Sequence, residues 1–306
     1  MNSIAESTMA VPSSAAWRSV VQVFKPRIAL EIMLAGVAGV AVTGSQGLPW
    51  WRLLALALAI FVAAGAAGAL NHLVEADLDA RMSRTRERPF VTGSLQAGPA
   101  WYLLVASLVA GAVALAGWTT NWIAAAFIFL GAFTYAVVYT LWLKRRTWLN
   151  IVIGGLAGSF AVLAGAAAVE PSLGRTAWLF ALVLFLWTPP HFWSLATYYR
   201  DDYAAAGVPM LPVVHGERVA AWAIFGHTLP LVTLSLVPVV WGEAGVFYAL
   251  CAGAGGAYFI WRAFLLLRRP SKSNAIRSFL ASLLQLGLLL LGAIAEGAWS
   301  GSLVAL

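Results

Sequence analysis

The chain has 306 residues, of which 61% are hydrophobic and only 10% are charged, and its net charge is +7. Soluble domains carry about 25% charged and about 45–50% apolar residues, so this composition excludes an ordinary soluble protein and indicates an integral membrane protein. The single cysteine excludes an intramolecular disulfide framework and a cysteine-rich metal or cluster site.

The N-terminal part of the chain differs from the rest in composition. Residues 1–23 are predicted to form a polar segment without a cleaved signal peptide, and residues 24–306 a single transmembrane domain. An apolar segment of about 20 residues can cross a bilayer as a helix. Nine such segments predict an all-α integral membrane protein of about nine transmembrane helices: 28–46, 52–73, 100–118, 122–143, 149–168, 176–198, 219–240, 244–266 and 276–297.

The basic residues are distributed unevenly between the loops that join these spans. When the loops are assigned alternately to two sides, 16 of the 19 Lys and Arg residues fall on one side, two on the other and one inside a span. Cytoplasmic loops carry an excess of Lys and Arg. We therefore expect a cytoplasmic N-terminus and a lipid bilayer as the surroundings of the chain. Nucleic acid is not expected as a partner.

A first polar stretch, NHLVEADLDARMSRTRERP (residues 71–89), directly follows the uncharged residues 53–70 of the second predicted span and holds four acidic residues and four arginines. Asn71, Glu75 and Asp79 are spaced i, i+4, i+8, so two further turns of helix would place them on one face. Carboxylates stacked in this way repel each other unless a cation lies beside them. Oxygen ligands suit Mg²⁺ better than Zn²⁺, so the spacing favours a magnesium site. Solvated acids that pair with nearby arginines are the alternative.

The other residues of this stretch have simpler interpretations. Asp77 points away from Glu75 on a helix and is expected to pair with local arginines, and His72 is expected to cap or pack. Arg81, Arg84 and Arg88 share a face if the helix continues, and guanidinium groups bind phosphate oxygens in a bidentate manner. We therefore predict Mg²⁺-assisted diphosphate binding at a membrane surface. The chain has no GxxxxGK[ST] phosphate loop, which argues against a nucleotide-hydrolysing enzyme.

A second polar stretch, LWTPPHFWSLATYYRDDYAAAGVPMLPVVHG (residues 186–216), ends the sixth predicted span. Pro189 and Pro190 are expected to break or kink this span, which favours a cavity. Asp201 and Asp202 follow, on the same predicted side of the membrane as the first stretch. The aromatic side chains are expected either to anchor the chain at the interface or to line a hydrophobic slot: Trp187, Phe192, Trp193, Tyr198, Tyr199 and Tyr203.

These two stretches resemble the motifs of a known family. Residues 71–89 resemble the first Asp-rich motif, N-x-x-x-[DE]-x-x-x-D, of the UbiA-type intramembrane prenyltransferases. Residues 185–214 are similar, more specifically, to the second motif of the heme O synthases (protoheme IX farnesyltransferases) within that superfamily. FKPRIALEIMLAGVAG (24–39) and YTLWLKRRTWLNIVIGGLAGS (139–159) add to the resemblance, which covers most of residues 24–216. The last ninety residues match only in hydropathy.

The resemblance implies a prenyltransferase domain over residues 24–306, in the cell inner membrane, that transfers farnesyl from farnesyl diphosphate to a vinyl group of heme b, giving heme O for terminal oxidases. It also implies Mg²⁺ as cofactor, and heme A synthase or oxidase assembly proteins as partners. A prenyltransferase for a quinone precursor or another aromatic acceptor is an alternative, which TPPHFW and DDYAAAGVPMLPVV disfavour. A transporter is a remote alternative, because the acids gather at one face rather than at the membrane midplane.

The resemblance also assigns roles to individual residues. Asn71, Glu75 and Asp79 would hold Mg²⁺ and the diphosphate, and Asp201 and Asp202 a second Mg²⁺. His191 would touch the heme iron as an axial ligand, unless it is a hydrogen-bonded structural residue. The residues expected to bind substrates are Arg27, Arg84, Arg88, Tyr139, Lys144, His191 and Arg200.

Two departures from the family pattern affect these expectations. Glu75 stands where many relatives have Asp, which keeps the carboxylate but lengthens its reach. FAVLAGAAAV (160–169) replaces a Pro-Pro pair and an aromatic residue, and is expected to reshape the pocket near the fifth span on the acceptor side.

Overall fold

The structure is a computed structural model that describes residues 14–43, 47–301 and 303. The described residues contain helices and no strands. Nine helical segments among them are long and apolar enough to cross a membrane, which confirms the predicted class. These spans are α2 (Pro26–Thr43), α3 (Trp50–Val74), α6 (Pro99–Thr119), α7 with η1 (Trp122–Leu143), α8 with α9 (Asn150–Val169), α10 (Arg175–Tyr198), α13 with α14 (Glu217–Val240), α15 (Val246–Arg268) and α16 (Lys272–Ser300).

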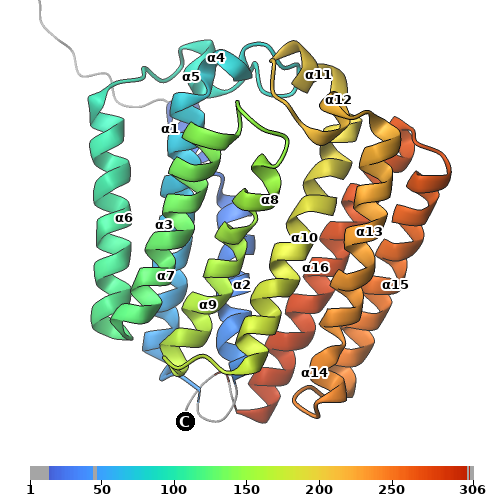
Figure 1. Cartoon of the computed structure of the whole chain (residues 1–306). Helices are drawn as coiled ribbons and strands as arrows, with labels where there is room; N and C mark the ends of the chain where they lie inside the picture. Colours follow the sequence, from blue (N-terminus) through green and yellow to red (C-terminus); the bar gives the residue numbers. More distant parts are fainter. Residues whose placement is uncertain (1–13, 44–46, 302, 304–306) are drawn as a thin grey trace, which may run out of the picture.

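The short helices gather mainly at one end of the bundle (Figure 1). The helix α1 (Ser14–Val23) lies at this end, together with α4 (Ala76–Asp79), α5 (Pro89–Thr92), α11 (Arg200–Ala205) and α12 (Leu211–Val214). Both polar stretches of the sequence therefore lie at the same end. Of the predicted N-terminal segment 1–23, residues 1–13 lie outside the described residues.

The first polar stretch does not simply extend the second span. The helix α3 ends at Val74, and Glu75 separates it from α4 with φ −105° and ψ 11°. The backbone N–H of Glu75 still donates to Asn71 O (3.2 Å), and that of Asp79 donates to Glu75 O (2.8 Å). The predicted unbroken helix is therefore wrong, but the four-residue spacing of the three side chains continues across the irregularity.

The fourth span ends in a wide helix that the sequence did not indicate. The segment η1 (Thr134–Leu143) is a π-helix, in which the N–H of Lys144 donates to Tyr139 O, five residues earlier. The hydroxyl of Thr140 donates to Tyr135 O in the same register. π-helical turns often occur at functional sites because they change the direction of nearby side chains. Here the wider turn carries Tyr135, Tyr139 and Lys144.

Pro189 and Pro190 were expected to break or kink the sixth span, and the break is wrong, because α10 runs without interruption from Arg175 to Tyr198. The two prolines leave the carbonyls of Phe185 and Leu186 without a helical N–H donor, which membrane helices tolerate where neighbouring helices pack against them. Two hydroxyl groups bond to carbonyls on either side of the pair. Thr188 donates to Leu184 O (3.1 Å) and Ser194 donates to Pro190 O (2.7 Å).

Close backbone packing fixes the position of α9 (Leu156–Val169). A Cβ atom added at Gly165 would overlap the carbonyl oxygen of Gly36, and one at Gly39 would overlap that of Val162. Small residues allow membrane helices to approach in this way. The α2–α9 contact holds the unusual stretch 160–169 in the centre of the bundle.

Candidate active site

The three side chains of the first polar stretch that were predicted to hold magnesium are buried at one end of the bundle. Asn71, Glu75 and Asp79 are 3%, 1% and 2% exposed. Buried carboxylates need a paired cation, because desolvation of an isolated charge is costly. Each of the three side chains has its own cationic partner from a different segment: Lys25 Nζ with Asn71 Oδ1 at 2.5 Å, Lys144 Nζ with Glu75 Oε2 at 2.5 Å, and Arg88 Nη1 with Asp79 Oδ2 at 2.6 Å.

Lys25 was not among the residues selected from the sequence. It lies just before the first span, with a positive φ of 48°, and its ammonium also donates to Tyr135 OH (3.0 Å). Desolvation lowers the pKa of Lys25 well below its usual value, and the neighbouring Arg88 and Lys144 lower it further, while Glu75 and Asp79 oppose them. In the sequence, Lys25 could have been noticed only as a second basic residue, two positions before Arg27.

The donor set fits a hard cation. It comprises one amide and two carboxylate side chains, and Glu75 Oε1 is buried without a hydrogen-bond partner among the described residues. Within those residues, no three His, Cys, Asp or Glu side chains converge to form a metal site. The acidic side chains instead face their own cations, so a metal would bind by sharing or displacing these pairs.

The second polar stretch reaches the first through Asp202. This half-buried carboxylate accepts hydrogen bonds from Ser83 Oγ (2.8 Å) and from the backbone N–H of Arg84 (3.3 Å). The side chain of Asp201 is 75% exposed and pairs with Lys272 at 2.7 Å. The structure thus brings Asp202, but not Asp201, to the first stretch.

The other residues selected from the sequence lie around this cluster or away from it. Arg84 stacks over the Tyr199 ring at 5.3 Å, and Arg200 Nε donates to Pro212 O (3.1 Å), with Glu217 at 3.8 Å. Arg27 is exposed and lies outside the cluster of pairs.

Asp77 pairs with an arginine as expected, but not with a local one. Its partner is Arg145, from the segment that follows the fourth span, at 2.7 Å. Hydrogen bonds from Arg145 hold the pKa of Asp77 below its usual range. His72 is buried, and its Nδ1 has no hydrogen-bond partner among the described residues. It therefore packs within the bundle and makes no cap through that atom.

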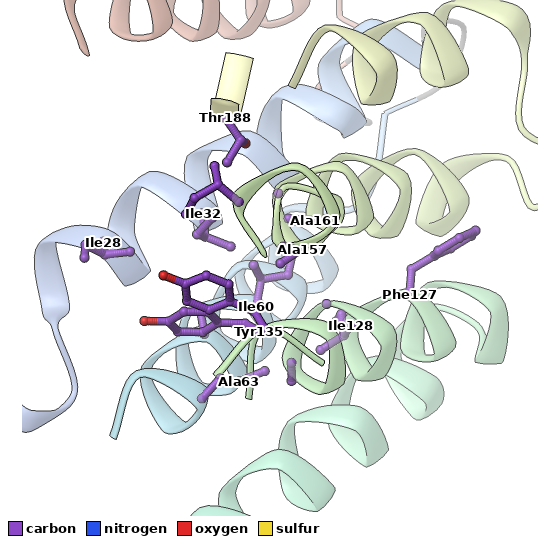
Figure 2. Close-up of a pocket in the computed structure, with 18 of the residues that line it drawn as sticks. Ile28, Ile32, Ile60, Ala63, Phe127, Ile128, Tyr135, Ala157, Ala161 and Thr188 are labelled. Atoms are coloured by element: carbon purple, nitrogen blue, oxygen red, sulfur yellow. The ribbon is translucent and has the colours of Figure 1, made fainter. Parts of the chain in front are cut away.

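An apolar cavity adjoins the charged cluster (Figure 2). It holds about 900 Å³ of space between atoms, part of which is open to the surroundings at its mouth. Tyr135 and Tyr139, stacked at 5.8 Å, form its polar end, because Lys25 donates to one hydroxyl and the Lys144 ammonium lies 5.8 Å from the other ring. The remaining lining comes from α2, α3, α7, α8, α9 and α10.

The unusual stretch 160–169 contributes to this cavity. Ala161 lines it, together with Ala157 and Gly158 one turn earlier on α9. Part of the departure from the family pattern thus lies on the wall of the apolar cavity, where Figure 2 labels Ala161 beside Ala157.

His191 lies on α10 in an aromatic and hydroxyl environment. Its Nδ1 is 2.8 Å from Ser282 Oγ, and its ring stacks on Trp187 at 4.2 Å and lies 4.6 Å from the Phe279 ring. It is buried (8% exposed). The Nδ1 atom of His191 therefore has a hydrogen-bond partner within the bundle, as expected if His191 is a hydrogen-bonded structural residue.

Comparison with known proteins agrees with these features. Residues 32–289 match the model of the UbiA prenyltransferase family. The chain is 51% identical over 279 residues to "Protoheme IX farnesyltransferase 2" of Paramagnetospirillum magneticum, covering 91% of this chain and 96% of the relative. It is 39% identical over 291 residues to "Protoheme IX farnesyltransferase" of Hahella chejuensis, covering 95% and 97%.

Solved structures show the same fold at low sequence identity. A UbiA homolog from Archaeoglobus fulgidus bound to DMAPP and Mg²⁺ superposes with a TM-score of 0.73 at 16% identity, covering 94% of this chain and all of that chain (100%). A UbiA homolog from Aeropyrum pernix gives 0.71 at 19% identity, covering 90% and 98%. The chain therefore belongs to the UbiA prenyltransferase family, and within it to the protoheme IX farnesyltransferases.

Proposed function

We propose that this protein transfers the farnesyl group of farnesyl diphosphate to a vinyl group of heme b, and so makes heme O. The observation that carries the proposal is the buried Asn71–Glu75–Asp79 cluster and its three cations at the polar end of an apolar cavity. Such a site suits a substrate with a charged head and a long apolar tail. The names of the close relatives support heme b as the acceptor. Heme A synthase or oxidase assembly proteins would then receive the product.

The reaction requires three changes of bonding. The allylic C–O bond of farnesyl diphosphate breaks, and the diphosphate leaves with the electron pair. The π bond of the heme b vinyl group then breaks, and its electron pair forms the new C–C bond to the farnesyl group. The oxygen of a water molecule then bonds to the cation that remains beside the porphyrin, and a proton passes to solvent.

The residues of the site can lower the barrier to the first step. Lys25, Lys144 and Arg88 converge on this end of the cavity, so they can stabilise the charge that develops on the leaving diphosphate. The apolar walls exclude water from the farnesyl cation before the acceptor attacks. The faces of Tyr135 and Tyr139 can stabilise that cation through their ring quadrupoles.

Asn71, Glu75 and Asp79 would hold Mg²⁺. When bound, this ion supplies further neutralisation of the leaving diphosphate. Asp202, which accepts hydrogen bonds from Ser83 and from the Arg84 backbone, would contribute to a second ion beside the first stretch. Arg84 would contact the diphosphate. Asp201 would have to release Lys272 before it could take part.

Pigment analysis after turnover tests this function. Purified protein with heme b, farnesyl diphosphate and Mg²⁺ should convert heme b to heme O. Excess EDTA should abolish conversion, and added Mg²⁺ should restore it. Full activity in EDTA without any divalent ion would rule out the magnesium site. Transfer to 4-hydroxybenzoate but not to heme b would instead identify a quinone-type prenyltransferase.

The bundle end that carries both polar stretches is proposed to face the cytoplasm, in the cell inner membrane. Thr85 lies in the middle of the first polar stretch, but its side chain is buried (2% exposed), so a cysteine there would not be accessible to a thiol reagent. The exposed Glu87 is therefore the better position for a labelling cysteine. In a Cys251→Ala background, Glu87→Cys should react only with a thiol reagent applied from the cytoplasm. Ser172→Cys, in the loop at the opposite end, should react only from outside. Reversed labelling would overturn the assignment.

His191 is proposed to act on the acceptor side. His191→Ala should reduce heme binding and heme O formation but leave Mg²⁺-dependent binding of farnesyl diphosphate close to that of the wild type. The matched variant Ser282→Ala removes only the hydrogen-bond partner of Nδ1 and should keep more of the heme binding. Loss of diphosphate binding with normal heme binding would move His191 to the donor site. A loss of thermal stability alone would leave it a structural residue.

A further inference from the structure

The apolar cavity has a direction. Its polar end lies at Tyr135 and Tyr139, beside the charged cluster, and Phe127 and Ile128 lie further along the same span. Figure 2 shows Phe127 and Ile128 on the side away from the hydroxyl of Tyr135. Eight residues separate Tyr135 from Phe127, which is about 12 Å at about 1.5 Å per helical residue. A prenyl chain whose diphosphate binds at the cluster would therefore extend toward Phe127.

The walls and the far end of the cavity are built from different residue types. Most of the wall residues are small, and these come from three spans: Ala63, Ala64, Ala67, Gly131, Ala132, Gly154, Ala157, Gly158 and Ala161. Isoleucines and Phe192 also contribute to the walls. The far end carries bulky side chains. Phe127 on α7 stacks on Phe160 on α9, with ring centroids 6.0 Å apart and an interplanar angle of 29°. This pair joins the two helices where the small residues would otherwise leave space.

We infer that the far end of the cavity selects the length of the prenyl chain, with the Phe127–Phe160 pair as its stop and Gly158 as the open point of its wall. This inference rests on the proposed function, because it takes the cavity as the site of the prenyl tail. A longer prenyl diphosphate meets the Phe127 ring, and a shorter one leaves the far end unfilled. Both mismatches lower the affinity for the prenyl diphosphate, because an apolar pocket discriminates between ligands by how well their apolar groups fill it.

Two substitutions should shift this selection in opposite directions. Phe127→Ala removes the ring and lengthens the cavity, so it should favour geranylgeranyl diphosphate. Gly158 lines the cavity, and a Cβ at this position meets no heavy atom within 4 Å, so Gly158→Leu would add a side chain to the cavity without a clash. It should therefore favour geranyl diphosphate.

Each substitution has a control outside the cavity. Phe129 is an exposed phenylalanine on the same helix that stacks on Phe133 at 5.8 Å and does not line the cavity. Gly111 on α6 is an exposed glycine with no heavy atom within 4 Å of an added Cβ. Phe129→Ala and Gly111→Leu repeat the chemical changes without altering the cavity.

The test is displacement of labelled farnesyl diphosphate from the purified full-length protein, in Mg²⁺, by geranyl and geranylgeranyl diphosphates. This measurement needs no acceptor. Phe127→Ala should improve the affinity for geranylgeranyl relative to farnesyl diphosphate by at least about tenfold, and Gly158→Leu should improve that for geranyl by at least about tenfold, since one methylene already changes discrimination by about tenfold or more. Both controls should keep the wild-type order.

Unchanged ratios in both cavity variants, or equal shifts in the controls, would overturn the inference. If Phe127→Ala does not yield folded protein, Gly158→Leu alone decides the outcome. Failure of the wild-type protein to prenylate heme b, with the predicted binding ratios intact, would reject the proposed acceptor while leaving chain-length selection in place. Absence of any prenyl diphosphate binding would reject both.

Discussion

Asp79→Asn should lower the rate of prenyl transfer to heme b by at least about 100-fold, or about 2.7 kcal/mol in the activation barrier. The substitution keeps the size of the side chain and removes its formal charge. Asp79 is buried, and its carboxylate accepts from Arg88 at 2.6 Å. The change therefore weakens the proposed magnesium site and also leaves the Arg88 guanidinium without its anionic partner. Turnover should be measured at saturating Mg²⁺.

Asp77→Asn is the matched control. Asp77 lies two residues earlier and makes the same kind of pair, with Arg145, but its side chain is 53% exposed. Exposed ion pairs contribute about 0–1 kcal/mol, so the control should lose less than about fivefold. Thermal unfolding of both variants separates a defect in folding from one in catalysis. Equal losses in the two variants, or a wild-type rate in Asp79→Asn, would remove Asp79 from the site.

The overall fold could be predicted well from the sequence because it depends on segment length and hydropathy. The nine predicted spans agree with helices of the described residues to within a few residues at each end, except that residues 44–46 of the first predicted span lie outside the described residues. The errors occur where specific backbone hydrogen bonds decide the geometry. Proline usually breaks a helix, yet α10 continues through Pro189 and Pro190. The irregularity at Glu75 and the π-helical register before Lys144 have no signal in hydropathy.

The candidate site could be predicted only in part. The i, i+4, i+8 spacing identified Asn71, Glu75 and Asp79, because it is a property of one local segment. Their partners are not local. Lys25 and Asn71 are 46 residues apart, and Lys144 and Glu75 are 69 residues apart. The spacing of residues within one segment carries no information about such distant pairs. The sequence therefore predicted the acidic residues of the site more completely than their cationic partners.

Lys25→Met should lower kcat/KM for farnesyl diphosphate by at least about 100-fold, because removing one preorganised donor to a developing anion costs about 10²–10³ in rate. The Lys25 ammonium bridges Asn71 Oδ1 and Tyr135 OH, where the charged cluster meets the apolar cavity. Methionine keeps the length and packing of the side chain and removes its charge and its donors. The rate should be measured below saturation, where binding and chemistry both contribute.

Arg27→Met is the decisive comparison, because the sequence favoured Arg27 rather than Lys25 as the diphosphate contact. Both residues are basic and lie two positions apart, but Arg27 is exposed and outside the cluster, whereas the Lys25 ammonium is turned into it. The loss in Arg27→Met should stay below about fivefold, as for an exposed charge. A large loss in Arg27→Met with a small one in Lys25→Met would mean that the diphosphate binds on the outer side of α2. Large losses in both variants would mean that the bound diphosphate draws Arg27 into the cluster.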